Sequence, residues 1–177
     1  MRIETERLII REFIKKDLNR LHEILSDPTV MEYVEEPFDR ADTKEYLDGY
    51  CIEEKSGFAI TRKADGNLIG LMQFPQFDDE SELVHQIGWA LHKDFWRQGF
   101  AYEAASAVIS YGFRTLGLHR IFASTTDDLK SAGLLKKLGF VQEGCLRKHE
   151  MCNNSEVWRD RLYFGILRKE YFSNETK

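Results

Sequence analysis

The apolar positions near the N-terminus predict one strand followed by two helices. Residues 8–13 are mostly apolar or β-branched and predict the strand. Asp17 can cap a helix, because the apolar residues after it recur at helical spacing. Pro28 marks the exit of this helix, and Asp39 or Asp42 opens the second one.

Two apolar segments in the middle of the chain predict a β-hairpin. Residues 57–62 and 67–74 flank Ala64-Asp65-Gly66, a typical tight-turn sequence. Residues 78–81 are acidic and predict a turn. The apolar run 83–91 then predicts a further strand.

The second half of the chain alternates helices and strands. Residues 105–116 predict an amphipathic helix that ends at Gly117, and its apolar face should pack on a sheet. The remaining expected elements are a strand over 121–125, a helix over 129–138 that ends at Gly139, a strand from Phe140 and a strand over 158–167. The order β-α-α-β-β-β-α-β-α-β-β predicts one α/β domain over residues 1–177. It should have a mixed, mostly antiparallel sheet and helices on both faces.

The short segment between the strand 83–91 and the long helix predicts a phosphate site. It contains Gly99, which lets a ligand approach the backbone closely, and the small residue Ala101. The unpaired amides of a first helical turn point outward, and the helix dipole adds positive charge there. Such a turn taken alone is as typical of a simple chain bend as of a binding site. Other segments of the sequence are therefore needed to distinguish the two.

Composition narrows the classes of function. The chain has 177 residues, 42% of them hydrophobic and 31% charged, with a net charge of −5. This acidic balance argues against broad nucleic-acid binding, although Arg97, Lys130, Lys136 and Lys137 can form a local basic patch near the proposed phosphate site. No apolar run is long enough for a membrane helix and no secretory leader is evident, so we expect a cytoplasmic protein.

Cysteine and histidine spacing indicates neither a disulfide framework nor a metal site. The three cysteines are an odd number without a C-x-x-C pair, and the five histidines show no ligand spacing. Cys145 is expected to be a small buried residue.

Five segments, taken together, resemble the GNAT superfamily of acetyl-coenzyme A-dependent N-acetyltransferases. The resemblance covers nearly the whole chain and is greatest to the branch that contains the ribosomal-protein N-terminal serine and alanine acetyltransferases. It implies a twisted, mostly antiparallel sheet of about six or seven strands with a V-shaped splay. The segments are Thr5-Glu6-Arg7-Leu8-Ile9-Ile10-Arg11, residues 87–104, residues 131–140 (SAGLLKKLGF), residues 143–147 and residues 159–163.

The same resemblance implies where acetyl-CoA would bind. The diphosphate would lie on backbone amides of the turn, and the pantetheine arm would pair with the preceding strand like an added strand. An amide near Ala90 or Leu91 would act as the oxyanion donor. Asp128 stands where relatives often carry an asparagine that helps to bind the cofactor, which puts that contact in doubt. The implied cofactor-binding residues are Trp89, Ala90, Leu91, Arg97, Gln98, Gly99, Phe100, Ala101, Tyr102, Asp128 and Ser131.

Two residues are the catalytic candidates by resemblance. Glu150, ten positions after Phe140, would deprotonate the acceptor amine directly or through water, although a surface glutamate is an equal alternative. Ser131 would protonate the departing thiolate, or would only cap the short helix. Asp160 is expected to be a structural or site-lining acid that holds the loop after Glu150, and not the base.

The sequence constrains the acceptor substrate less than it constrains the fold or the acetyl donor. In relatives the first two helices and the last two strands form the acceptor groove, and here these segments carry acids and aromatic residues that suit a cationic amine. We therefore expect transfer to a primary amine such as the N-terminus of a ribosomal or other protein. The alternatives are a polyamine, another small amine such as an antibiotic, or a non-catalytic acyl-CoA sensor on the same scaffold. No membrane, direct nucleic-acid partner or metal is expected, and a homodimer stays open.

Overall fold

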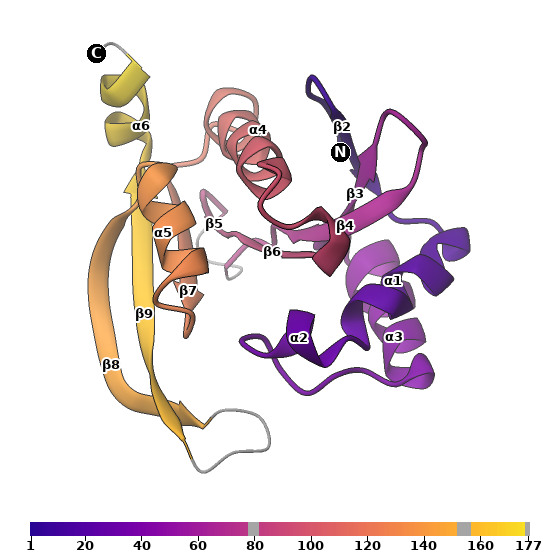
Figure 1. Ribbon diagram of the computed structural model, residues 1–177. Helices are drawn as coiled ribbons and strands as arrows, with labels where there is room; N and C mark the ends of the chain where they lie inside the picture. The colour runs from indigo at the N-terminus through magenta and orange to yellow at the C-terminus, as the bar shows by residue number, and fades with distance from the viewer. Residues whose placement is uncertain (78–81, 152–156, 176–177) are drawn as a thin grey trace.

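Two β-sheets that diverge from each other form the frame of the molecule (Figure 1). The computed structural model describes residues 1–77, 82–151 and 157–175, so the acidic turn expected at 78–81 lies outside the described residues. The strands are β1 (Arg2–Glu4), β2 (Leu8–Glu12), β3 (Gly57–Arg62), β4 (Leu68–Gln73), β5 (Val84–Gln86), β6 (Gly88–Leu91), β7 (Arg120–Thr125), β8 (Val141–Met151) and β9 (Trp158–Leu167). The α-helices are α1 (Leu18–Leu25), α2 (Pro28–Met31), α3 (Arg40–Tyr46), α4 (Phe100–Arg114), α5 (Lys130–Lys137) and α6 (Arg168–Glu175).

The first sheet has the strand order β1-β2-β3-β4-β6, and every neighbouring pair in it is antiparallel. The second has the order β5-β7-β9-β8, in which only the β5–β7 pair is parallel. The predicted α/β fold with a mostly antiparallel, splayed sheet is confirmed. The described residues form nine strands in two sheets instead of the expected six or seven in one, because the strand β1 was not expected and the apolar run 83–91 is divided between the two sheets.

That change of sheet occurs at Ile87. The run 83–91, expected as one strand, is divided into β5 and β6. Gln86 N–H still donates to Pro75 on the side of the first sheet at 3.0 Å, whereas Ile87 N–H donates to the carbonyl of Phe122 in β7 at 2.8 Å. Gly88 then returns to the first sheet as the partner of Gln73. As a result β6 follows β4 and separates from β7.

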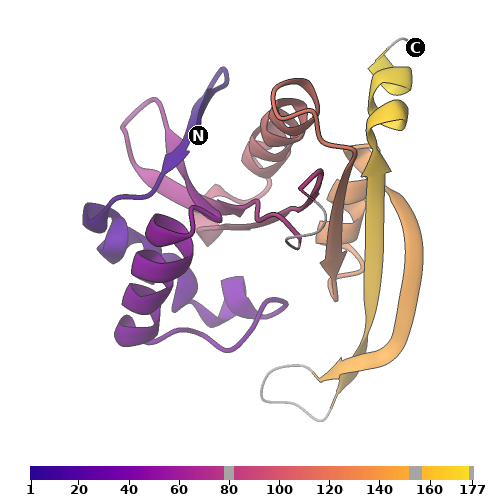
Figure 2. The same ribbon diagram turned by 180° about the vertical axis from the view of Figure 1, so that it is seen from behind.

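Helices cover both faces of the first sheet, as expected (Figures 1 and 2). Helix α4 packs on one face and also reaches the second sheet, so one core joins both. The core on this side includes Leu8, Ile60, Val108, Phe113, Ile121 and Phe164. The core on the other face, beneath α1 and the segment after α3, includes Leu21, Ile24, Leu47, Cys51, Ala59 and Leu71.

Local capping agrees with the sequence in one helix and differs in another. Asp39 caps α3 by accepting from the amides of Ala41 and Asp42 at 2.7 and 2.8 Å. Asp17 precedes α1 but makes no capping bond, because its carboxylate binds Arg11 and the amide of Ile14.

Three further features depart from the sequence-based expectation. Pro28 begins the short helix α2 rather than only ending α1, because Asp27 accepts from the amide of Thr29 and caps it. The edge strand β1 and the terminal helix α6 were not expected. No helix in the described part of the chain is both long and apolar enough to cross a membrane.

Candidate active site

The outer edge of β6 carries backbone groups that no neighbouring strand uses in the described residues. Residues 88–91 pair with β4 in antiparallel register, Leu71 opposite Ala90 and Gly70 opposite Leu91. His92 N–H donates to Ile69 at 2.9 Å, and bonded residues alternate along such a ladder. The amides of His92, Ala90 and Gly88 therefore face β4.

Trp89 and Leu91 consequently present their backbone N–H groups away from β4, toward the opening between the sheets. The carbonyl of Leu91 accepts from the indole Nε1 of Trp96 at 2.8 Å, whereas the amide of Leu91 makes no hydrogen bond with the described residues. Of the two oxyanion donors considered from sequence, the register favours Leu91, because the amide of Ala90 faces β4.

The segment that joins β6 to α4 has two residues in the left-handed region. Arg97 has φ of 59° and Gly99 has φ of 82° with ψ of 0°, where it forms the N-cap of α4. A non-glycine residue in this region costs about 1 kcal/mol or more, so the conformation at Arg97 has to be held by its surroundings. Left-handed turns collect backbone N–H groups on one side and form anion-binding concavities.

The expected cofactor residues of this segment lie together at the start of α4. Arg97 and Gln98 are exposed, and a Cβ on Gly99 would come within 4 Å of one atom alone among those described, Arg7 Nη2 at 3.4 Å. Phe100 is only 5% exposed and packs in the core, so it can offer its backbone and not its ring. Room for a ligand and outward amides at one helix end fit the diphosphate of coenzyme A.

Helix α5 lies beside this turn and brings positive charge to it. Lys130 Nζ lies 5.2 Å from the ring centroid of Trp96, and Lys137 Nζ lies 4.6 Å from that of Tyr102. The local basic patch expected from the sequence therefore includes these two lysines.

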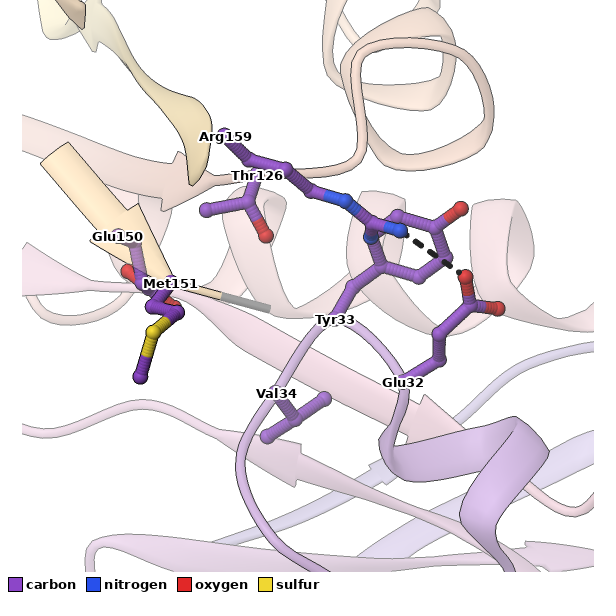
Figure 3. Close-up of a pocket in the computed structure, with 7 residues that line it drawn as sticks. All are labelled: Glu32, Tyr33, Val34, Thr126, Glu150, Met151 and Arg159. Atoms are coloured by element: carbon purple, nitrogen blue, oxygen red, sulfur yellow. Dashed lines mark hydrogen bonds and ion pairs between the residues drawn. The ribbon is translucent and has the colours of Figure 1, made fainter. Parts of the chain in front are cut away.

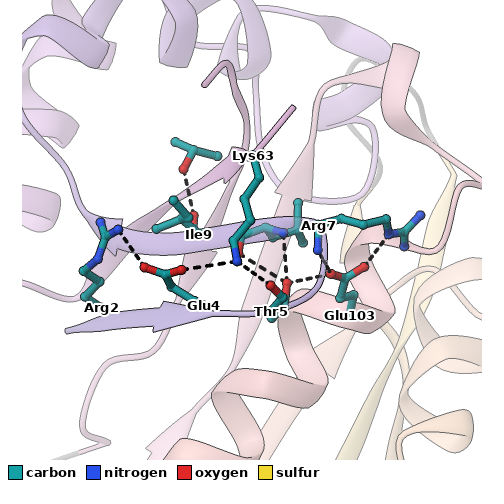
Figure 4. Close-up of polar contacts among 9 residues, drawn as sticks. Arg2, Glu4, Thr5, Arg7, Ile9, Lys63 and Glu103 are labelled. Atoms are coloured by element: carbon teal, nitrogen blue, oxygen red, sulfur yellow. Dashed lines mark hydrogen bonds and ion pairs between the residues drawn. The ribbon is translucent and has the colours of Figure 1, made fainter. Parts of the chain in front are cut away.

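The first turn of α4 is tied to the N-terminal hairpin by Glu103 (Figure 4). Its carboxylate accepts from Thr5 Oγ1 at 2.6 Å, from the amide of Arg7 at 2.8 Å and from Arg7 Nε at 2.6 Å. Burial alone would raise the pKa of Glu103, but these hydrogen bonds outweigh it and lower the pKa. Arg7 Nη1 also donates to the carbonyl of Gln98 at 3.0 Å.

Ser131 lies in the first turn of α5 but is not its cap. Asp127, which is buried, accepts from the amides of Leu129, Lys130 and Ser131 and takes the capping role considered for Ser131. The Ser131 hydroxyl itself donates to Asp127 at 3.3 Å. Asp128 is exposed at the end of the loop between β7 and α5.

Glu150 lines a pocket between the segment after α2 and the ends of β7, β8 and β9 (Figure 3). One of its carboxylate oxygens forms an ion pair with Arg161, whose other nitrogen donates to Ser124 at 2.9 Å. The pocket is lined by Glu32, Tyr33, Val34, Thr126, Glu150, Met151 and Arg159.

Tyr33 connects this pocket to the start of α5. Its ring lies 4.2 Å from the guanidinium of Arg159 and 5.8 Å from Lys130 Nζ, and Glu32 forms an ion pair with Arg159 at 3.3 Å. Thr126, which also lines the pocket, precedes the Asp127 that binds Ser131. Both catalytic candidates are therefore placed at the same end of β7.

A second, more apolar pocket lies against β6 on the side of α1 and α3. Tyr46 accepts a hydrogen bond from Gln73 at 2.9 Å, and burial raises the pKa of its hydroxyl. Glu35 also lines this pocket and has no hydrogen-bond or ion-pair partner in the described part of the chain, and partial burial of its carboxyl raises its pKa. The lining residues are Leu25, Met31, Val34, Glu35, Phe38, Tyr46, Leu71, Gln73, Trp89 and Ala90. Val34 lines both pockets, so the two adjoin.

Asp160 holds the strand β8 just before Glu150. It accepts from the amide of Lys148 at 2.9 Å, where the backbone has φ of 49° and the pairing with β9 shifts register. The loop after Glu150, which Asp160 was expected to hold, lies outside the described residues, and the observed contact is on the strand before it. Cys145, expected to be buried, is exposed and lies 3.7 Å from the same carboxylate, because β8 is an edge strand.

Three polar residues of this region were not identified from the sequence. Arg7 and Glu103 are 96 positions apart, and Asp127 caps a helix whose start was assigned to Ser131. Arg7 lies in the N-terminal segment 5–11 and Glu103 in the segment 87–104, both of which carry the family resemblance. The sequence therefore marked both segments, but it did not show that these two side chains contact each other. Within the described residues no three histidine, cysteine or acidic side chains gather as metal ligands.

Comparison with known proteins agrees with this geometry. The model of the acetyltransferase (GNAT) domain matches residues 7–141. The uncharacterized N-acetyltransferase YnaD of Bacillus subtilis is 34% identical over 173 residues, which cover 97% of this chain and 99% of YnaD. The crystal structure of a GNAT-family acetyltransferase from Bacillus anthracis superposes with a TM-score of 0.85 at 31% identity, covering 96% of this chain and 99% of that one.

More distant relatives have named acceptors. The [ribosomal protein uS5]-alanine N-acetyltransferase of Escherichia coli is 27% identical over 97% of this chain and 93% of its own length. A spermidine N-acetyltransferase from Vibrio cholerae, solved in complex with CoA and spermine, shares the fold with a TM-score of 0.81 at 24% identity, over 95% of this chain and 99% of that one. The domain match and the similarity to YnaD confirm the resemblance drawn from the five segments: the chain belongs to the GNAT acetyltransferase family and is an acetyl-CoA-dependent N-acetyltransferase.

Proposed function

We propose that the chain transfers an acetyl group from acetyl-CoA directly to the primary amine at the N-terminus of a protein or peptide. The observation that carries the proposal is the continuity of the open edge of β6 with the left-handed turn at the start of α4. An edge strand recognises an extended chain of amides, and a helix start recognises a diphosphate. The two lie in the order in which pantetheine and diphosphate follow each other in coenzyme A.

Different residues along β6 and the following turn would contact different parts of acetyl-CoA. The backbone amides between Arg97 and Tyr102 would hold the diphosphate, with Lys130 and Lys137 adding positive charge nearby. The free backbone groups of Trp89 would pair with the pantetheine amides. The amide of Leu91 would donate to the thioester oxygen as negative charge develops on it, a contact that typically contributes about 3–4 kcal/mol to lowering a barrier.

The acceptor proposal rests on the charge of the two adjoining pockets. Glu32 and Glu150 are each paired with an arginine, whereas Glu35 has no partner among the described residues. One unpaired carboxylate beside apolar walls suits a single ammonium group attached to an apolar or peptide body. A polyamine carries several ammonium groups and would leave the others without a partner in these pockets.

A polyamine is the second candidate acceptor, because a relative of the same fold is a spermidine acetyltransferase. The acidic residues Glu32 and Glu150 would favour it if their arginines moved aside. The named relatives therefore support both classes, and the ion pairs seen here favour the peptide.

The two catalytic assignments remain predictions with defined chemistry. Glu150 would take the proton of the acceptor amine through its second carboxylate oxygen or a water, because the first oxygen is occupied by Arg161. The neutral amine nitrogen would then bond to the acetyl carbon while the carbon–sulfur bond breaks, and the second proton that the nitrogen loses would pass to solvent. Ser131 would deliver its hydroxyl proton to the thiolate and recover one from solvent, which requires its bond to Asp127 to open.

A panel of acceptors tests the proposal. Release of free thiol from acetyl-CoA is measured with peptides that begin with serine or alanine, with spermidine and with an aminoglycoside, each over a range of concentrations. We expect the peptides to have the highest kcat/KM. A higher kcat/KM for spermidine would replace the peptide by the polyamine, and calorimetry with coenzyme A checks the donor site independently of the acceptor.

A further inference from the structure

The guanidinium of Arg7 is placed behind the proposed diphosphate turn. Its Nη1 donates to the carbonyl of Gln98 at 3.0 Å, and its Nε is anchored on Glu103 at 2.6 Å. The guanidinium carbon lies 4.4 Å from the ring centroid of Phe100, which fixes the plane of the group. Arg7 therefore contacts three successive parts of the turn, namely the residue before Gly99, the residue after it and the first turn of α4.

The carbonyl of Gln98 and the amide of Gly99 belong to the same peptide group. The described chain contains no cis peptide bonds, so this group is trans and its C=O and N–H point in opposite directions. Holding the carbonyl on Arg7 therefore aims the Gly99 N–H to the opposite side of the turn. A cationic donor on the carbonyl also polarises the peptide group and makes its N–H a better donor.

We propose that Arg7 is a positioning residue for the coenzyme A diphosphate, which it serves by orienting and polarising the amide of Gly99. The inference rests on the proposed function, because it takes the turn to be the diphosphate site. It adds a reason for the conformation of this turn: the peptide group between Gln98 and Gly99, which follows the left-handed Arg97, is held from behind by a charge carried in the loop between β1 and β2.

A purely structural role for Arg7 predicts a different outcome. If Arg7 only joined the N-terminal hairpin to α4, its loss would destabilise the fold and affect every donor equally. If it orients the Gly99 amide, its loss affects only donors that carry a diphosphate. The difference between the two roles lies in the choice of acetyl donor.

The experiment compares acetyl-CoA with S-acetylpantetheine, which lacks the diphosphate and the nucleotide. For Arg7→Met we expect kcat/KM with acetyl-CoA to fall about tenfold, equivalent to about 1.4 kcal/mol, through a higher KM. We expect kcat/KM with S-acetylpantetheine to change less than about twofold. Calorimetry should show the same tenfold weakening for coenzyme A, and thermal unfolding records the stability change separately.

Arg62→Met is the matched control. Arg62 also lies over an aromatic ring, that of Phe95 at 5.0 Å, and also forms an ion pair, with Asp65, but in the described part of the chain it makes no hydrogen bond or ion pair with residues 97–103. The Arg62→Met variant should have the same kcat/KM as the wild type with acetyl-CoA and with S-acetylpantetheine. Should Arg7→Met fail to fold, Arg7→Lys carries the same test, because a lysine keeps the charge but cannot bind Glu103 and the carbonyl of Gln98 through one rigid fork.

Equal losses with both donors, or no loss with either, would overturn the positioning role. Failure of the proposed function itself is distinguishable, since the wild-type protein would then show no preference for acetyl-CoA over S-acetylpantetheine. A preference in the wild type that Arg7→Met reduces supports both proposals.

Discussion

The most direct test of the diphosphate turn is a pair of substitutions at Gly99, to aspartate and to asparagine. Both residues tolerate a left-handed backbone better than other side chains, and they have nearly the same shape. The observed φ of 82° should cost each variant about 1 kcal/mol, which for a protein of this size lowers Tm by about 2–4 °C. The pair therefore separates the charge at this position from its shape.

The effect of the charge on binding follows from Coulomb's law. A carboxylate about 5 Å from a phosphate charge is repelled by about 1 kcal/mol in a water-like medium and by about 3 kcal/mol at an effective dielectric constant of 20. Arg7 Nη2 lies 3.4 Å from the position of the new Cβ and would neutralise part of the new charge. We therefore expect a loss near the lower of these two values, about a further fivefold loss of coenzyme A affinity for Gly99→Asp relative to Gly99→Asn.

Isothermal titration with coenzyme A at low and high salt is the assay. The difference between the two variants should shrink as salt rises, because the repulsion is partly exposed to solvent and is screened. Equal affinities for the aspartate and asparagine variants at low salt would refute the assignment of residues 97–102 as the diphosphate site.

Three further substitutions test the acceptor side and the chemical step. Glu150→Gln should lower kcat at neutral pH by at least tenfold while coenzyme A affinity stays the same; near-normal turnover, measured by thiol release, would remove Glu150 as the base. Ser131→Ala should slow single-turnover transfer more than its change in Tm accounts for, because Asp127 caps α5 without it; an unchanged single-turnover rate would leave the hydroxyl without a catalytic role. Glu35→Gln should raise KM for the acceptor several-fold and leave KM for acetyl-CoA unchanged. Burial raises the pKa of the Glu35 carboxyl above its value in the unfolded chain. The charged carboxylate therefore destabilises the folded state. This destabilisation is absent below the usual glutamate pKa and grows as pH rises to the pKa of the folded protein. Thermal unfolding should accordingly show Glu35→Gln gaining Tm relative to wild type at pH 7 and not at pH 4, and a gain that is the same at both pH values would contradict this account.

Elements set by local sequence were predicted well. The hairpin around Ala64-Asp65-Gly66 and the strand Trp158–Leu167 have the expected positions. In these two segments the period of apolar residues and the burial agree, so the local pattern is sufficient. Helix α4, expected over 105–116, instead spans Phe100–Arg114 and begins directly after Gly99.

Features set by partners distant in sequence were not predicted. The run 83–91 is divided at Ile87 because the Ile87 amide donates to the carbonyl of Phe122 in the second sheet. This partner is 35 positions away in the sequence, so the local pattern of residues does not predict it. The contact between Arg7 and Glu103 likewise appears only when the N-terminal hairpin and α4 are brought together. Asp127 replaced Ser131 as the cap because a buried carboxylate can accept from three successive amides at once.

The change of sheet at Ile87 makes the chain intolerant of altered length at that point. Adding or removing one residue between β5 and β6 would exchange the two faces of every residue that follows, up to the turn. The amide of Ala90 would then look outward and that of Leu91 inward, and Trp89 would exchange sides with its neighbours. Relatives that keep the same chemistry are thus expected to conserve the spacing between Ile87 and Gly99 more strictly than the identities of the residues within it.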